Sequence, residues 1–308
     1  MFFVRFWGVR GSMPCPGSDT YRYGGNTACL EIRAGKTENS SGGRLVIIDC
    51  GTGIRLLGEE LMKKDYYNSP IDADIFITHT HWDHIMGFPM FNPIFEPSTN
   101  LRIRGPVISE EDSLENIIGT QLSYKFWPVR QSELASKIEY DKLKETSFDL
   151  GDGLRVTTKY LNHSILCMGY RFEYQGKSIV TAFDHEPFRN LFPSDPSDPN
   201  YDEGATIEGE EAAREENDKI LEFIKNADIL IYDSQYTAAE YKEHKGWGHS
   251  SFDLAIETAK KANVKKLVFF HHDPGRTDKQ LNKIEKQYQK ISVNTDVLMA
   301  REGLTIEV

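Results

Sequence analysis

The feature that constrains this chain most is a run of metal-ligand side chains directly after an apolar segment, Thr78-His79-Thr80-His81-Trp82-Asp83-His84. The apolar residues before the run, 74–78, are predicted to form a strand. A turn that leaves a strand can aim alternate residues at one point, which a regular helix could not do for His79 and His81. Imidazole nitrogens with an added carboxylate oxygen suit zinc, iron, manganese or nickel. We therefore expect a metal site at the end of a strand.

One such run is too small to hold two ions, so further ligands should come from elsewhere in the chain. The candidates share one position, just past the end of an apolar run, and they are His163, Asp184 and His271. In α/β proteins, sites lie outside the ends of the strands, which is where all three would be placed. The adjacent His272 is an alternative to His271, but counting from the strand end, as for His79, favours His271.

The pattern along the chain predicts one α/β domain over residues 1–308. Predicted strands come first as a meander and later alternate with helices; they cover 2–8, 28–33, 45–49, 74–78, 101–104, 154–161, 168–173, 178–182, 227–232 and 265–270. Helices are expected over 54–64, from the capping serines Ser250 and Ser251, and from Thr277, whose partner Gln280 completes a capping box. Two stretches are predicted to be insertions, 109–134 and 193–218; the second starts as a loop and becomes an acidic helix from Glu208.

Composition excludes several classes of protein. The 36 Lys and Arg residues stand against 47 Asp and Glu, a formal charge of −11, which is unlike a generic basic nucleic-acid binder. No apolar run reaches eighteen residues, so no membrane span is expected. The first residues look like a strand and not a signal peptide. The four cysteines form no CxxC pair, which favours reduced thiols in a cytoplasmic protein.

At this point the chain resembles the metallo-β-lactamase-fold metallohydrolases, and within them the ribonuclease Z-like phosphodiesterase branch. Three motifs carry the resemblance: Phe6-Trp7-Gly8-Val9-Arg10-Gly11-Ser12-Met13-Pro14, Ile48-Asp49-Cys50-Gly51-Thr52-Gly53, and the run that ends at His84. The resemblance covers nearly the whole chain. It implies an α/β fold, a four-layer αβ/βα sandwich, with a dinuclear metal site at one edge.

The resemblance also implies a ligand set for two divalent metal ions, zinc first, with manganese or iron as alternatives. One ion would be held by His79, His81 and His163. The second would be held by Asp83, His84 and His271, with Asp184 bridging both ions. A hydroxide between the ions would be the nucleophile, and Asp83 would also take part in catalysis.

A further histidine, His249, lies in the glycine-flanked segment Gly246-Trp247-Gly248-His249-Ser250. In the branch that the chain resembles, an equivalent histidine protonates the leaving oxygen or stabilises developing charge, and it needs an acidic partner. Asp233 resembles that partner, although relatives often have Glu there. Asp49 is expected to fix a ligand histidine through its second nitrogen; an ordinary turn-capping role is its alternative.

Other polar residues leave two interpretations open. Arg10 could contact a phosphate or form a structural ion pair, and Asn26 could line the same pocket or serve its turn. His244 is expected at the surface. Phe126 and Trp127 could stack on a base or ring, although a core or dimer contact is favoured.

Together these features predict a dinuclear metal-dependent hydrolase, a phosphodiesterase of small or cyclic nucleotide-type substrates. The excess of acidic over basic residues and the lack of a basic arm predict that long nucleic acids are not substrates. The two insertions would suit a homodimer. Two alternatives remain: hydrolysis of thioester, lactone or β-lactam bonds by the same metals, and a noncatalytic nucleotide or metal sensor.

Overall fold

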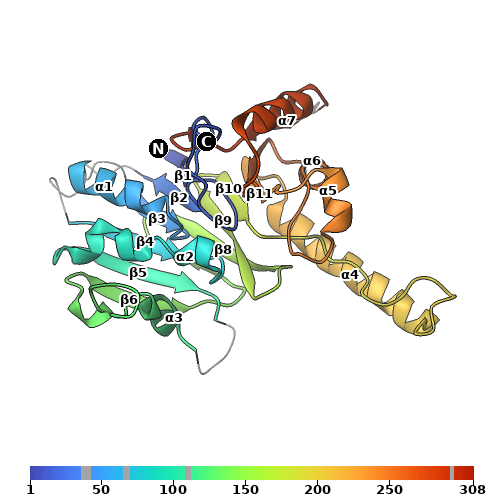
Figure 1. Cartoon of the computed structure of the whole chain (residues 1–308), viewed down its shortest axis with the longest axis horizontal. Coiled ribbons are helices and arrows are strands. Elements are labelled where there is room, and N and C mark those ends of the chain that lie inside the picture. The colour runs from blue at the N-terminus through green and yellow to red at the C-terminus, as the bar shows by residue number, and fades with distance from the viewer. Residues whose placement is uncertain (36–42, 65–69, 108–111, 292–294) are drawn as a thin grey trace.

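The computed structural model describes residues 1–35, 43–64, 70–107, 112–291 and 295–308. Two β-sheets lie against each other, with α1, α2 and α3 on one side and α4, α5, α6 and α7 on the other (Figure 1). The molecule is therefore the predicted four-layer αβ/βα sandwich. Within the described residues, no helix is both long and apolar enough to span a bilayer.

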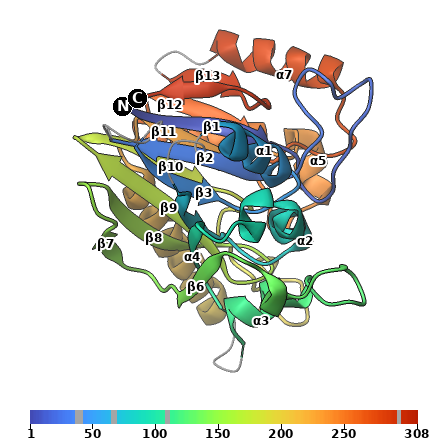
Figure 2. The same cartoon turned by 90° about the vertical axis from the view of Figure 1, so that its left-hand side faces the viewer.

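The first sheet has the strand order β14-β1-β2-β3-β4-β5-β6 in the described part of the chain. Strands β1, β2 and β3 pair antiparallel, and β3 to β6 pair parallel. The bounds are β1 Phe2–Gly8, β2 Cys29–Ala34, β3 Arg44–Ile48, β4 Asp72–Phe76, β5 Asn100–Gly105, β6 Lys137–Lys142 and β14 Thr305–Glu307. Because β14 returns to β1, the two termini lie side by side (Figures 1 and 2).

The second sheet repeats this plan, with the described strands in the order β13-β12-β11-β10-β9-β8-β7 (Figure 2). Its antiparallel part runs from β7 to β10, and its parallel part from β10 to β13. The bounds are β7 Ser147–Asp149, β8 Arg155–Leu161, β9 Cys167–Tyr174, β10 Lys177–Ala182, β11 Ile229–Asp233, β12 Lys266–Phe270 and β13 Asp296–Met299.

The helices cover the outer faces of the two sheets. The α-helices are α1 Ile54–Lys64, α2 Trp82–Ile85, α3 Leu114–Thr120, α4 Glu203–Ile224, α5 Ala238–Glu243, α6 Phe252–Lys261 and α7 Asp278–Ile291. Short 3₁₀ helices lie at Phe88–Met90, Asn92–Phe95 and Gln131–Glu133. The predicted caps of α6 and α7 are present: the Ser251 side chain accepts from Leu254 N, and Thr277 and Gln280 bond each other reciprocally.

The core between the sheets is aromatic where strands from both halves of the chain meet. The rings of Phe76, from β4, and Tyr170, from β9, pack edge to face at 5.0 Å, and Phe183 stacks on Phe270 at 4.2 Å. Each fully buried ring of this kind contributes ~1.5–3 kcal/mol by leaving water. This packing fixes the ends of β4, β10 and β12 relative to one another, and those ends carry the site described below.

Some element boundaries differ from the predictions. The acidic helix α4 begins at Glu203 rather than Glu208, because Asp202 caps it by accepting a hydrogen bond from Ala205 N at 3.0 Å. Its C-terminal turn is buried, while its N-terminal part projects from the body (Figure 1). Residues 109–111 of the first predicted insertion lie outside the described residues; its helix α3 is capped by Ser113.

Candidate metal centre

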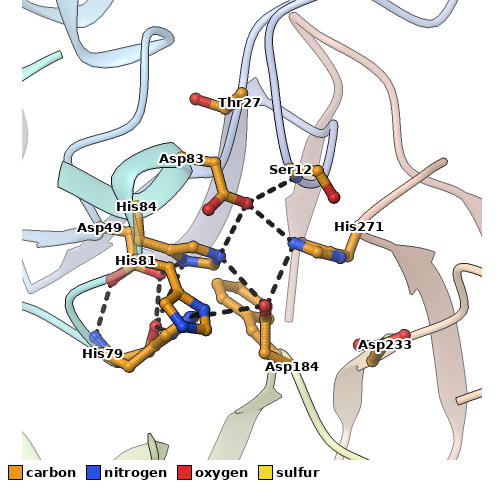
Figure 3. Close-up of polar contacts among 12 residues, drawn as sticks. Ser12, Thr27, Asp49, His79, His81, Asp83, His84, Asp184, Asp233 and His271 are labelled. Atoms are coloured by element: carbon orange, nitrogen blue, oxygen red, sulfur yellow. Dashed lines mark hydrogen bonds and ion pairs between the residues drawn. The ribbon is translucent and has the colours of Figure 1, made fainter. Parts of the chain in front are cut away.

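The predicted ligands come together where the ends of strands from both sheets meet. His79 and His81 follow β4, and Asp83 and His84 lie in the single turn of α2 (Figure 3). The second sheet supplies three residues, each placed just after a different strand: His163 after β8, Asp184 after β10 and His271 after β12.

The predicted ligand atoms form two groups that share one carboxylate, and Asp184 and His271 also form a third group with Asp233 and His249. We call His79, His81, His163 and Asp184 the open group, because His81 and His163 are only partly buried. We call Asp83, His84, Asp184 and His271 the buried group, because all four are buried. Within each group the ligand atoms lie within 4.8 Å of one another.

The carboxylate of Asp184 faces one group with each oxygen. Its Oδ1 lies 3.2 Å from Nε2 of both His84 and His271 in the buried group. Its Oδ2 lies 3.6 Å from Nε2 of His79 and 3.8 Å from Nε2 of His163 in the open group. Asp184 is thus positioned between the groups, as Figure 3 shows.

The donor set fits divalent metal ions. In the open group, His81 Nδ1 lies 2.9 Å from His79 Nε2 and 3.1 Å from His163 Nε2, so three ring nitrogens converge. In the buried group, His84 Nε2 and Asp184 Oδ1 lie 3.2 Å apart, but among the described residues neither makes a hydrogen bond of good geometry. Buried polar atoms normally have partners, and converging nitrogen and carboxylate lone pairs are what a divalent cation satisfies.

Electrostatics favour the metal-binding protonation state at His79 and Asp184, whereas at His84 the carboxylates of Asp184, Asp83 and Asp49 outweigh burial and raise the pKa. Burial, together with the neighbouring His84, lowers the pKa of His79, which favours the neutral imidazole. Burial raises the pKa of Asp184, but the facing His271, His84 and His79 outweigh it and lower that pKa well below the ordinary range. Neutral histidines and an ionised carboxylate are the ligand forms that a metal requires.

Side chains orient the histidines of the buried group. Asp49 Oδ2 lies 2.7 Å from His84 Nδ1, and the same carboxylate accepts from Thr78 N at 2.7 Å. Gln235 Oε1 lies 3.1 Å from His271 Nδ1. Contacts of this kind set the tautomer, so that Nε2 presents its lone pair to the metal. Asp49 therefore makes the contact that was expected of it, whereas Gln235 was not predicted.

In the open group, the Thr78 hydroxyl lies 3.2 Å from His79 Nδ1, whereas the backbone orients His163. His163 Nδ1 lies 2.9 Å from the carbonyl oxygen of Gly248. A Cβ at Gly248 would lie 2.2 Å from His163 Nδ1, and one at Gly11 would lie 2.3 Å from His271 Cε1. Only glycine lets the backbone approach each ligand ring so closely. Asp184 and His271 themselves adopt positive φ angles of 46° and 62°, a strained conformation typical of functional sites.

His249 and Asp233 form the predicted pair at the edge of the cluster. His249 Nδ1 lies 2.7 Å from Asp233 Oδ2, and the His249 ring stacks on His271 with centroids 4.9 Å apart. Burial alone would lower the pKa of His249, but the charge of Asp233 and its hydrogen bond raise that pKa to about 9. Asp233 is itself held by Ser250 N at 3.1 Å, so the shorter carboxylate reaches its histidine.

Glu186 organises the turn before His249, and this role was not predicted from the sequence. Its buried carboxylate accepts from Gly246 N at 2.9 Å, Gly248 N at 3.0 Å and Tyr241 Oη at 2.9 Å. Its position two residues after Asp184 was the only signal in the sequence. The residues that it binds lie more than fifty positions away, so the contact follows from the tertiary fold.

Contacts decide two of the open interpretations, those of Arg10 and of the His271–His272 pair, and they also place His244. Arg10 is buried and donates to the carbonyls of Gly24 at 2.7 Å and Arg276 at 2.7 Å, so it ties loops together. His272 Nε2 lies 2.8 Å from Ala300 O, outside the cluster, which leaves His271 as the cluster member. His244, expected at the surface, is partly exposed there, and its ring stacks on Tyr236 at 4.7 Å.

Comparisons with known proteins agree with this fold. The family described as "Beta-lactamase superfamily domain" matches residues 44–190. A ribonuclease Z of Streptococcus uberis is 28% identical over 291 residues, which cover 84% of this chain and 89% of that protein. The Bacillus subtilis metallo-β-lactamase fold protein YhfI matches with a TM-score of 0.63 at 17% identity, over 100% of this chain and 99% of that one. The short form of human tRNase Z matches with a TM-score of 0.61 at 20% identity, over 99% of each chain.

These relatives correct one prediction. The expectation that long nucleic acids are not substrates was wrong, because the relatives are by name ribonucleases and a tRNase. The error came from treating the charge of −11 as uniform. Ten acidic residues against one arginine lie in 193–218, largely on the projecting part of α4, so the total charge does not describe the surface around the site.

Proposed function

This chain is a metallo-β-lactamase-fold protein of the β-lactamase superfamily, and from that premise we propose that it is a metal-dependent phosphodiesterase. The observation that carries the proposal is the His249–Asp233 pair, which stands against a His/Asp cluster with a shared central carboxylate. The similarity to ribonuclease Z proteins also supports cleavage of phosphodiester bonds. RNA chains and small or cyclic nucleotide-type diesters both fall within this substrate class.

We infer that the open group and the buried group hold one divalent ion each, with zinc expected first and manganese or iron as alternatives. The two oxygens of Asp184, each turned toward one group, support a count of two. When bound, such ions polarise the scissile phosphate and activate the attacking water. The buried thiols of Cys29, Cys50 and Cys167, none in a disulfide, support a reducing, cytoplasmic location.

The protein's own residues would then assist the departure of the leaving group. Asp233 holds Nδ1 of His249, which leaves Nε2 free to donate a proton to the departing oxygen. The stack on His271 keeps the His249 ring beside the ligand cluster. Asp83, held by Ser12 N at 2.7 Å, is positioned by the loop that follows β1 and contributes a carboxylate to the buried group.

A panel of substrates tests this function. Zinc- or manganese-loaded protein is assayed with bis-p-nitrophenyl phosphate, cyclic AMP, a tRNA with a 3′ extension, nitrocefin and a thioester. We expect turnover of phosphodiesters, and a loss of about 10²–10⁴-fold in kcat for His249→Ala while metal content stays the same. Turnover of carbon esters or β-lactams alone would overturn the proposal, and nucleotide binding without any turnover would indicate a sensor.

A further inference from the structure

A cavity of about 190 Å³ opens beside the open group. Its lining includes His163 and Gly248, and also Phe188, Arg189 and Leu191, which follow Asp184 along the chain. Its volume is well above the ~30 Å³ that one water molecule occupies in the liquid, so the cavity has room for a phosphate-sized group.

Arg189 is the cation of this cavity, and it is free to bind a ligand. Its side chain is exposed, and its Nη2 lies 2.8 Å from the position that a Cβ of Gly246 would occupy, so the guanidinium rests on the turn before His249. Among the described residues, no carboxylate forms an ion pair with it. This contrasts with Arg276, which pairs with Glu240 at 2.7 Å.

The acid in the same cavity does not compete for that guanidinium. Both carboxylate oxygens of Glu186 are engaged by the backbone N–H groups of Gly246 and Gly248 and by the hydroxyl of Tyr241. Glu186 thereby fixes the turn on which Arg189 rests. The five N–H donors of Arg189 are left to face the cavity and the solvent.

We propose that this cavity is a subsite for a second phosphate of the substrate, one that flanks the scissile phosphodiester, and that Arg189 recognises it. The inference rests on the proposed function and narrows its substrate class to nucleotide chains that carry at least two phosphates. His163 belongs both to the open group and to the cavity wall, so a chain cleaved at the open group reaches the cavity with its neighbouring phosphate. A guanidinium matches a phosphate with two parallel hydrogen bonds, which a lysine cannot do.

The test compares a dinucleoside monophosphate with the same compound carrying a terminal phosphate at its 5′ or 3′ end. For the wild type we expect about a tenfold higher kcat/KM for one of the phosphorylated forms, the scale of a charge-assisted contact. In Arg189→Ala that ratio should fall to about one, and in Arg189→Lys it should be intermediate. Arg214→Ala, which removes an exposed arginine from α4, should leave the ratio and the activity unchanged.

A binding measurement gives a second readout. A nucleoside 3′,5′-bisphosphate should bind metal-free wild-type protein more tightly than it binds Arg189→Ala by about the same factor, and added NaCl should reduce that difference. A wild-type enzyme that cleaves both dinucleotides without preference, or an unchanged ratio in Arg189→Ala, would overturn the subsite alone. A wild type that cleaves no phosphodiester at all would instead overturn the proposed function.

Discussion

The open and buried groups share Asp184 but differ in how the protein holds them. In the buried group, side chains orient the ligands: Asp49 fixes His84, and Gln235 fixes His271. In the open group, a backbone carbonyl orients His163 and the Thr78 hydroxyl contacts His79, and the group borders the Arg189 cavity. We infer that the buried group is the fixed anchor of the centre and that the open group is the side from which substrate enters. The predictions below test this division.

Adding a methyl group beside one ligand ring of each group should have the largest effect. Gly11→Ala places a Cβ 2.3 Å from the ring of His271, and Gly248→Ala places one 2.2 Å from Nδ1 of His163. Because each clash falls on a ligand itself, we expect a loss of more than ~100-fold in affinity for one ion, the buried one in Gly11→Ala and the open one in Gly248→Ala. Elemental analysis and competition with a chelator measure the two affinities.

For Gly11→Ala and Gly248→Ala, an effect on folding has to be distinguished from an effect on metal binding. Gly248 also has a positive φ of 82°, so its substitution strains the backbone. Circular dichroism and thermal unfolding of the metal-free variants show whether the fold survives. Loss of both ions to the same degree in two folded variants would contradict the division into groups.

A smaller effect is expected from Asp49→Asn, which keeps the shape of the side chain but removes the charge that faces His84 Nδ1. Affinity for the buried ion should fall about 10–100-fold, the usual cost of losing an orienting partner. The open ion should be retained. Metal titration of the variant measures both affinities, and an equal loss at the two groups would show that Asp49 supports the whole centre instead.

The smallest effect on the centre is expected from Asp74→Asn, because Asp74 lies away from both groups. This buried carboxylate binds Arg44 at 2.7 Å, Arg102 at 2.9 Å and also Arg104. Burial raises the pKa of Asp74, but the three guanidinium groups outweigh it and lower that pKa. The ionised carboxylate therefore stabilises the fold above the unfolded pKa of ~3.9, and that contribution is lost as the pH falls through the lower folded value.

Urea unfolding at several pH values checks this expectation. At pH 7 the variant should be less stable than wild type by about 3 kcal/mol, with unchanged metal content. The difference should persist down to about pH 4 and shrink below it. A change in metal stoichiometry would show that loss of stability alone weakens metal binding. The glycine and Asp49 variants would then no longer distinguish the two groups.

The features that the sequence predicted are those set by residues close together in the chain. The run from His79 to His84 was recognisable because its ligands are adjacent in the chain. His163, Asp184 and His271 were predicted from one shared position, after apolar strands that the sheets then bring to one edge. The helix starts at Ser251 and Thr277 were predictable because capping is local.

The unpredicted features depend on contacts between distant segments. Nothing local marks Glu186, Gln235 or the close approach of Gly11 to His271, which joins residues 260 positions apart. The edge strand β6 was missed because its side chains are largely exposed and polar, so it lacks an apolar run. The exclusion of nucleic acids failed for a related reason: total charge carries no information about where the charges lie.

The most direct test of the account is a metal titration of metal-free protein, with phosphodiester turnover measured after each addition of zinc or manganese. We predict that two ions bind per chain and that full turnover requires the second. In Asp184→Asn, which removes one charge from the carboxylate shared by both groups, binding of both ions should weaken and turnover should be lost. Full phosphodiester turnover by metal-free protein, or unchanged binding of two ions in Asp184→Asn, would contradict the account.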